Sequence, residues 1–241
     1  MPVRAQVGTA DHTRVVPTPI IASDMDGTLS TAETWRGVHA WILAHHPSSA
    51  ARRFVLTQLP LIGLTRTGLF DRELFRARWL RNHARLLRGV PTMDLTAMGE
   101  WVVDQHLWPA RRQPAIDALA GASRDARDRE PGVRLILASG AYQPIVDAFA
   151  ARVGADLALG TPLGIRDGVA TGSLADDVQA GGQKAAAIRA QAAGAPVLAA
   201  FGDTAADIPL LELALRPIAV APDPILRRVA IERGWEILDG S

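Results

Sequence analysis

Six short apolar runs constrain the fold of this 241-residue chain more than any other feature. Each run is rich in Val, Ile, Leu or Ala and is bounded by Gly, Pro, Asp or Ser, as short buried strands are. The runs span residues 19–23, 133–139, 156–160, 196–202, 217–221 and 235–238, and predicted helices follow at 143–153, 183–193, 205–214 and 224–233. This alternation predicts an α/β protein with a doubly wound parallel sheet that is covered by helices on both faces.

A long insertion separates the first apolar run from the second. A crossover between parallel strands needs only about a dozen residues, whereas more than 100 residues without a convincing strand lie here. Five of the six Trp residues fall in this stretch, which indicates a small helical cap with an aromatic core. The predicted helices between the first and second runs span residues 31–45, 71–88, 93–107 and 109–129, the last with Pro109 at its first helical position.

These patterns predict two domains. Residues 1–29 and 109–241 are expected to form the α/β core domain, and residues 30–108 the helical cap. Within the core, the Asp-Gly pair at 167–168 predicts a hairpin turn in the segment 164–173.

Composition excludes several kinds of partner and chemistry. The chain has 26 basic and 25 acidic residues, a net charge of +1, so no basic stripe for nucleic acid is expected. It has no Cys, which excludes thiolate nucleophiles and Cys-ligated metals. No signal peptide is predicted, and the most apolar stretch, 54–64, is far shorter than the roughly 20 residues that cross a bilayer. We therefore expect a soluble, cytoplasmic protein without stable membrane insertion; its oligomeric state is not predicted.

Two polar clusters follow the first two apolar runs. Asp24 and Asp26 project from the same side where the first run ends, and two such carboxylates repel unless a cation or shared proton intervenes. An Asp-rich turn is the alternative interpretation. Ser139 and Gly140 end the second run, where a hydroxyl and free backbone N–H groups can hold an anion. Ser139 could instead cap the helix that follows.

Two further clusters lie later in the chain. Lys184 is the only lysine, and it stands near the start of a predicted helix, where a cation is disfavoured unless an anion binds beside it. Asp203 and Asp207 follow the run 196–202. Asp207 could be the acidic partner of Thr204 in a capping box, but that leaves Asp203 unexplained.

All four clusters stand at strand ends or helix starts of one predicted sheet. Ligands of such sheets bind beyond the carboxyl ends of the strands. Mg²⁺ prefers hard oxygen ligands, and phosphate prefers Lys and backbone N–H groups. The combined set of acids, one hydroxyl and one lysine therefore predicts a site for Mg²⁺ and phosphate.

The four motifs resemble those of the haloacid-dehalogenase-like (HAD) superfamily of phosphatases. They are DxDGT at 24–28, the strand-terminal Ser139, Lys184, and GDxxxD at 202–207; the segment 219–235 resembles the phosphoserine-phosphatase-like IB branch. The resemblance implies a Rossmann-like core, a cap inserted after the first strand, and a phosphomonoesterase, a phosphoric monoester hydrolase, acting on a small phosphorylated metabolite.

The resemblance also implies roles for the acidic residues. Asp24 is expected to attack phosphorus and form an aspartyl-phosphate. Asp26 is expected to protonate the leaving group and then deprotonate the attacking water. Mg²⁺ is expected to bind the Asp24 carboxylate, the Asp26 backbone carbonyl and Asp203. Asp207 is expected to lie next to these ligands without binding the ion directly. Ser139, Gly140 and Lys184 are expected to bind the phosphate oxygens.

Substrate choice is assigned to the cap. Glu33 stands where phosphoserine phosphatases carry a Glu that reads the substrate amino group, although it could be an ordinary solvated residue. The cap Arg expected for a substrate carboxylate is replaced by His83, unless His83 is only a helix-surface residue, and Ala141 replaces a usual second Gly. We therefore predict a Mg²⁺-dependent phosphatase for small phosphomonoesters. The alternatives are a phosphoserine-specific phosphatase and a non-catalytic phospho-receiver, although receivers are about half this length.

Overall fold

A six-stranded parallel sheet forms the centre of the computed structural model, which describes residues 17–54 and 72–239. The strand order is β3-β2-β1-β6-β7-β8, so the order reverses beside β1. All six predicted strands are present, and the predicted α/β class is confirmed. The strands are β1 (Ile20–Ser23), β2 (Arg134–Tyr142), β3 (Leu157–Thr161), β6 (Val197–Gly202), β7 (Ala214–Val220) and β8 (Glu236–Leu238).

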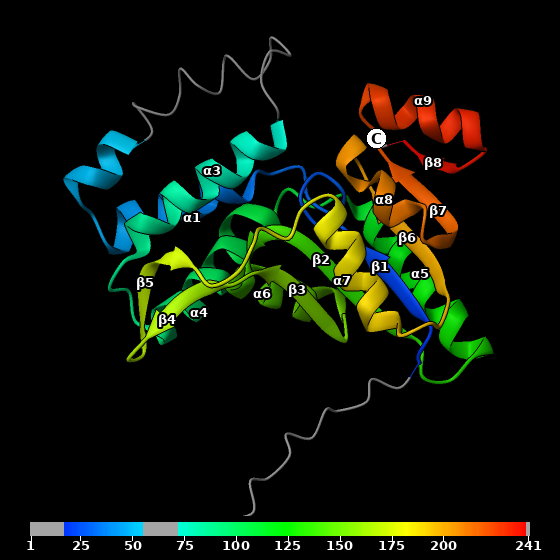
Figure 1. Ribbon diagram of the computed structural model, residues 1–241, viewed down its shortest axis with the longest axis horizontal. Coiled ribbons are helices and arrows are strands. Elements are labelled where there is room, and N and C mark those ends of the chain that lie inside the picture. Colours follow the sequence, from blue (N-terminus) through cyan, green and yellow to red (C-terminus); the bar gives the residue numbers. More distant parts are fainter. Residues whose placement is uncertain (1–16, 55–71, 240–241) are drawn as a thin grey trace, which may run out of the picture.

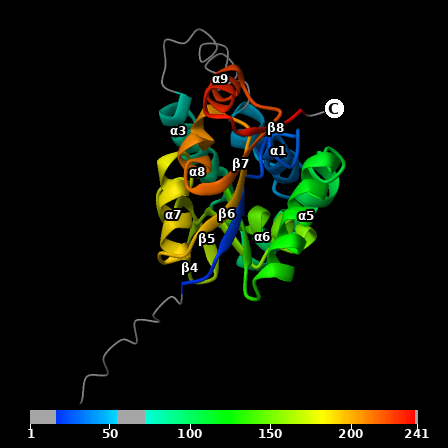
Figure 2. The ribbon, with the colours of Figure 1, turned by 90° about the vertical axis from the view of Figure 1, so that its right-hand side faces the viewer.

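Helices cover both faces of this sheet (Figure 2). Alternate strand residues supply two buried apolar layers: Ile21 packs on the side of α5 and α6, and Ile20 on the side of α7, α8 and α9. These helices are α5 (Gln113–Arg129), α6 (Gln143–Val153), α7 (Gly182–Ala192), α8 (Ile208–Leu211) and α9 (Pro224–Arg233). The doubly wound arrangement therefore places the carboxyl ends of β1 and β6 side by side, where such sheets bind ligands.

The helical insertion lies between β1 and α5, as predicted. Its elements include α1 (Thr34–His45), α3 (Arg72–Ala84), the 3₁₀ turn η1 (Arg85–Leu87), α4 (Thr92–Val102) and the π-helical turn η2 (Val103–Leu107). Figure 1 shows α1 and α3 at one end of the molecule, with the hairpin of β4 (Leu163–Arg166) and β5 (Val169–Leu174) near them. The predicted turn of that hairpin is confirmed, with Asp167 and Gly168 both at positive φ. The domain boundaries at 29/30 and 108/109 stay a prediction.

Some predicted boundaries are wrong. Helix α5 begins at Gln113, not Pro109, because the chain before it pairs with the other connection to the insertion. Thr31 N donates to Ala110 O at 2.9 Å, and Arg112 N donates to Leu29 O at 2.8 Å. The predicted helix at 205–214 is only a 3₁₀ turn, η3 (Ala205–Asp207), followed by α8, because β7 begins early. Most of the apolar stretch 54–64, and the start of the predicted helix 71–88, lie outside the described residues.

His83 lies in a buried aromatic cluster, so a helix-surface position for it is wrong. Its side chain is fully buried and stacks on Trp79 at a ring-centroid distance of 4.8 Å. Its Nδ1 lies 3.5 Å from the Tyr142 hydroxyl, which donates to Leu80 O. Burial, together with the nearby His39, lowers the pKa of His83 to about 3.

This burial predicts an acid-sensitive fold. The unfolded chain takes up a proton on this residue below an ordinary pKa of about 6.5, whereas the folded chain does not until about pH 3. The neutral His83 therefore supports full stability above about pH 6.5, and this contribution is lost as the pH falls further, by roughly 2 kcal/mol at pH 5. We expect His83→Phe, which keeps a ring without the titration, to lose less unfolding free energy between about pH 7.5 and 5 than the wild type in urea titrations. Equal losses in both proteins would contradict this explanation.

Candidate active site

Three carboxylates meet at the carboxyl edge of the sheet. Asp24 directly follows β1, and its backbone N–H donates to Phe201 O at 3.0 Å, which ties it to the neighbouring β6. Asp203 and Asp207 follow β6. One carboxylate oxygen from each of the three acids lies within 4.8 Å of the others. The Thr28 hydroxyl is 3.0 Å from oxygens of both Asp24 and Asp203, so it links the two strand ends.

Lys184 lies buried among these carboxylates. Helix α7 places its Nζ 2.5 Å from Asp24 Oδ1 and 2.7 Å from Asp207 Oδ1. The other oxygen of Asp207 accepts hydrogen bonds from the Thr204 backbone and hydroxyl, both at 3.1 Å. The capping box interpretation of Asp207 is thus correct, but the same carboxylate also orients the lysine.

The charges in this cluster do not balance. Burial raises the pKa of Asp24 to about 6. Burial and the neighbouring Asp24 and Asp207 raise the pKa of Asp203 to about 8. Burial alone would lower the pKa of Lys184, but the carboxylates of Asp207 and Asp24 outweigh it and hold the pKa above its ordinary value. One lysine faces three acids, so the cluster has the oxygen donors and the excess negative charge that a divalent cation needs.

Asp26 is not one of these three acids, although its charge contributes to the raised pKa of Asp24. Two hydroxyls bind its carboxylate. The Thr34 hydroxyl, from the start of α1, donates to one carboxylate oxygen. The Ser139 hydroxyl, from β2, donates to the other at 3.3 Å. The insertion and the core therefore both orient Asp26.

Ser139 does not cap the next helix. Strand β2 continues to Tyr142, and that residue, not Ser139, occupies the N-cap position of α6. The expected strand-to-helix junction at Ser139 is wrong by three residues, because the strand continues through a register shift against β3. Ser139 Oγ instead accepts the Ala141 N–H at 3.1 Å and faces Asp26.

Two other predicted residues have contacts outside the carboxylate cluster. The Gly140 carbonyl accepts the Thr161 hydroxyl at 2.9 Å. Glu33 is exposed at the N-cap of α1, with Oε2 2.5 Å from Arg36 Nε. The substrate-binding roles of both stay predictions. Sequence reasoning missed Thr34, the residue next to Glu33, because a lone Thr at a helix start has no signal beyond helix capping.

Gly27 allows the close packing of the loop after β1. Its φ is +85°, and a Cβ built there would lie 2.0 Å from Asp203 Oδ2. Gly168 also has a positive φ, +77°, but a Cβ there would meet no atom within 4 Å. Ala substitutions at these two glycines therefore distinguish backbone strain, which both would suffer, from the steric conflict with Asp203, which only Gly27→Ala would suffer.

We expect Gly27→Ala to destabilise the protein at least twice as much as Gly168→Ala. Gly168→Ala should lower the free energy of unfolding by about 1 kcal/mol, the usual penalty for Ala in a left-handed conformation. Gly27→Ala adds to this penalty a clash with Asp203. Urea unfolding of the two variants measures the difference. Similar losses would show that Asp203 moves aside freely.

A family model for haloacid dehalogenase-like hydrolases matches residues 21–212. The chain therefore belongs to the haloacid dehalogenase-like hydrolase family. It is 32% identical to a phosphoserine phosphatase of Halobacterium salinarum over 211 residues, which cover 85% of this chain and 87% of that protein. It is 30% identical to phosphoserine phosphatase SerB1 of Mycobacterium tuberculosis over 167 residues, 66% of this chain and 51% of that protein. The chain thus spans about half the length of the mycobacterial relatives that it matches.

Solved structures share this fold. A Bordetella pertussis protein of unknown function superposes with a TM-score of 0.73 at 23% identity, covering 93% of this chain and 100% of that one. A phospho-aspartyl intermediate analogue of phosphoserine phosphatase gives a TM-score of 0.57 at 20% identity, covering 94% and 95% of the two chains. Within residues 17–54 and 72–239, no helix combines the length and apolarity required to cross a bilayer.

Proposed function

We propose that the protein is a Mg²⁺-dependent phosphatase that hydrolyses a small phosphomonoester through an aspartyl-phosphate on Asp24. The observation that carries this proposal is the Asp24 carboxylate itself. It is buried at the sheet edge, with Lys184 Nζ at 2.5 Å and Asp203 in the same cluster. A carboxylate held in this way is oriented for attack on a phosphorus atom that Lys184 helps to bind.

The donor set suits Mg²⁺. Asp24, Asp203 and the Asp26 backbone carbonyl would hold the ion, since Asp207 already accepts hydrogen bonds from Lys184 and from the Thr204 backbone. When bound, Mg²⁺ would supply positive charge that offsets the excess of carboxylates and stabilises charge on the phosphoryl oxygens.

The side chains divide the reaction between them. An oxygen of Asp24 forms a bond to phosphorus as the bond from phosphorus to the leaving oxygen breaks. Asp26 gives its proton to that leaving oxygen and later takes a proton from the water that hydrolyses the acyl phosphate. The hydroxyls of Thr34 and Ser139 orient Asp26 for both transfers. Ser139, Gly140 and Lys184 would bind the phosphate oxygens.

Phosphate release from p-nitrophenyl phosphate tests this proposal. We expect repeated turnover with Mg²⁺, and loss of turnover when a chelator removes the metal. A phospho-receiver would instead take up at most one phosphoryl group per chain without continued release. Failure of the wild-type protein to release phosphate from this ester and from simple phosphomonoesters would contradict the proposed activity.

We predict a broad substrate range without a clear preference for phosphoserine. Glu33 is the candidate for reading a substrate amino group, but its carboxylate is exposed and paired with Arg36, which offsets its charge. The names of the relatives favour the alternative, a phosphoserine-specific enzyme. A substrate panel decides between them. A kcat/KM for phosphoserine more than about a hundredfold above all other esters, near 2.7 kcal/mol, would refute broad specificity.

A further inference from the structure

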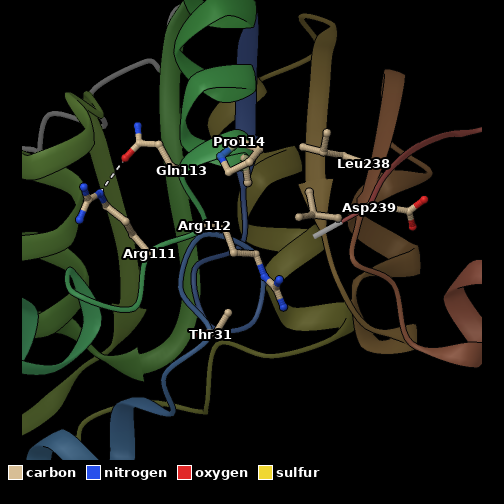
Figure 3. A pocket seen from close by; sticks show the side chains of 9 residues that line it. Thr31, Arg111, Arg112, Gln113, Pro114, Leu238 and Asp239 are labelled. Atoms are coloured by element: carbon tan, nitrogen blue, oxygen red, sulfur yellow. Dashed lines mark hydrogen bonds between the residues drawn. The ribbon is translucent and has the colours of Figure 1, made fainter. Parts of the chain in front are cut away.

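A cavity lies at the connections between the core and the helical insertion. Its volume is about 330 Å³, near the lower limit of roughly 300 Å³ for small-molecule pockets. Four segments that are distant in sequence enclose it: the segment after β1, the start of α5, the end of β7 and the end of β8 (Figure 3). The lining residues are Thr31, Arg111, Arg112, Gln113, Pro114, Ala115, Val220, Leu238 and Asp239. Asp24, Asp203 and Asp207 do not line it, so it is separate from the proposed active site.

Arg112 is the cation that faces this cavity. Its Nε donates to Gly27 O at 2.9 Å, and within the described part of the chain its guanidinium has no ion pair. Arg111 is engaged elsewhere: its Nε donates to Gln113 Oε1 at 2.7 Å, and Figure 3 shows this pair directed away from Arg112. Asp239 pairs with Arg227, and its carboxylate also points away from Arg112.

The remaining walls are mostly apolar. Pro114, Val220 and Leu238 contribute hydrocarbon surface around the guanidinium. With Nε already bonded to Gly27 O, the two Nη groups present the planar fork that matches a carboxylate. That hydrogen bond also fixes the Arg112 side chain, which lowers the entropy lost when a ligand binds.

We propose that this cavity binds a small organic monocarboxylate, with its carboxylate on Arg112 and its apolar part against Pro114, Val220 and Leu238. The site does not depend on the proposed catalytic activity. It would still affect the loop that follows β1, because Arg112 bonds to Gly27 O through its side chain and to Leu29 O through its backbone. A ligand that holds Arg112 should therefore rigidify this loop.

Calorimetric titration with hexanoate tests the site without reference to activity. We expect saturable binding to the wild type, and binding of the neutral hexanamide at least about tenfold weaker, because it lacks the charge that pairs with Arg112. Arg112→Gln should weaken hexanoate binding at least about tenfold. Thr31→Glu should weaken hexanoate binding to a similar extent, because the new carboxylate would compete with hexanoate for the Arg112 guanidinium. This variant keeps Arg112 and its hydrogen bond to Gly27. The control is Arg111→Gln, which removes the other cationic residue of the lining, whose Nε is already bonded to Gln113. Its hexanoate affinity should stay within about twofold of the wild type.

Three results would overturn the proposal. One is the absence of saturable hexanoate binding to the wild type at concentrations up to about 10 mM. Another is unchanged binding in both Arg112→Gln and Thr31→Glu, which would place the hexanoate elsewhere. The third is equal loss in Arg111→Gln, which would reduce the effect to general surface charge. Weaker hexanoate binding in both Arg112→Gln and Thr31→Glu, with nearly unchanged binding in Arg111→Gln, would support the site.

Discussion

Asp24→Asn should abolish phosphate release, lowering kcat by at least about 10³-fold, or roughly 4 kcal/mol of transition-state stabilisation. The amide keeps the size of the side chain but cannot attack phosphorus. The fold should persist, because Lys184 retains its 2.7 Å contact with Asp207. In the absence of metal, the unfolding temperature should be equal to or above that of the wild type, since one of three neighbouring carboxylates is neutralised.

The measurement for this variant is steady-state hydrolysis with Mg²⁺, paired with a thermal unfolding curve. Asp128→Asn on α5 is a matched control, because Asp128 is exposed and lies far along that helix from its start. It should keep wild-type kinetics. Near-native hydrolysis by Asp24→Asn would show that another group attacks phosphorus.

Lys184→Arg should lower kcat/KM at least about a hundredfold, near 2.7 kcal/mol, although it keeps the positive charge. The lysine is 5% exposed and bridges two carboxylates at 2.5 and 2.7 Å. A guanidinium is longer and planar, so its donors cannot occupy the same point between Asp24 and Asp207.

An Arg-to-Lys substitution in the same helix serves as the control for Lys184→Arg. Arg189 is an exposed residue of α7, so Arg189→Lys should leave kcat/KM unchanged. Comparison of the two variants separates the buried position from any general effect of exchanging Arg and Lys. Wild-type efficiency in Lys184→Arg would mean that the single lysine of the chain is a coincidence of composition.

The residues at strand ends were predictable because strand periodicity and sheet topology act together. Apolar runs that end in acids place those acids at one edge of the sheet when the strands are parallel. The sequence alone therefore predicts that Asp24 and Asp203 lie close together. The role of Lys184 was equally predictable from the sequence, since a lone lysine near a helix start conflicts with the helix dipole. Both inferences depend on local pattern and one general rule of sheet geometry.

Contacts made by the insertion were not predictable in the same way. Thr34 reaches Asp26 only because α1 starts close to the sheet edge, and His83 is buried only because α1, α3 and β2 meet around it. The start of α5 was misplaced because pairing between the two connections, such as Arg112 N to Leu29 O, outweighs the local preference of Pro109 for a helix start. Such long-range contacts leave no periodic trace in the sequence.

Trapping the covalent intermediate tests the central claim most directly. The wild-type protein would be mixed with excess phosphomonoester and Mg²⁺, quenched in acid during turnover, and digested with trypsin; the peptide spanning residues 15–36 carries both Asp24 and Asp26. We predict a hydroxylamine-sensitive phosphoryl group that fragmentation assigns to Asp24, and its absence in Asp24→Asn. A phosphoryl group on Asp26 or on any other residue during turnover would contradict the assignment of Asp24 as the nucleophile.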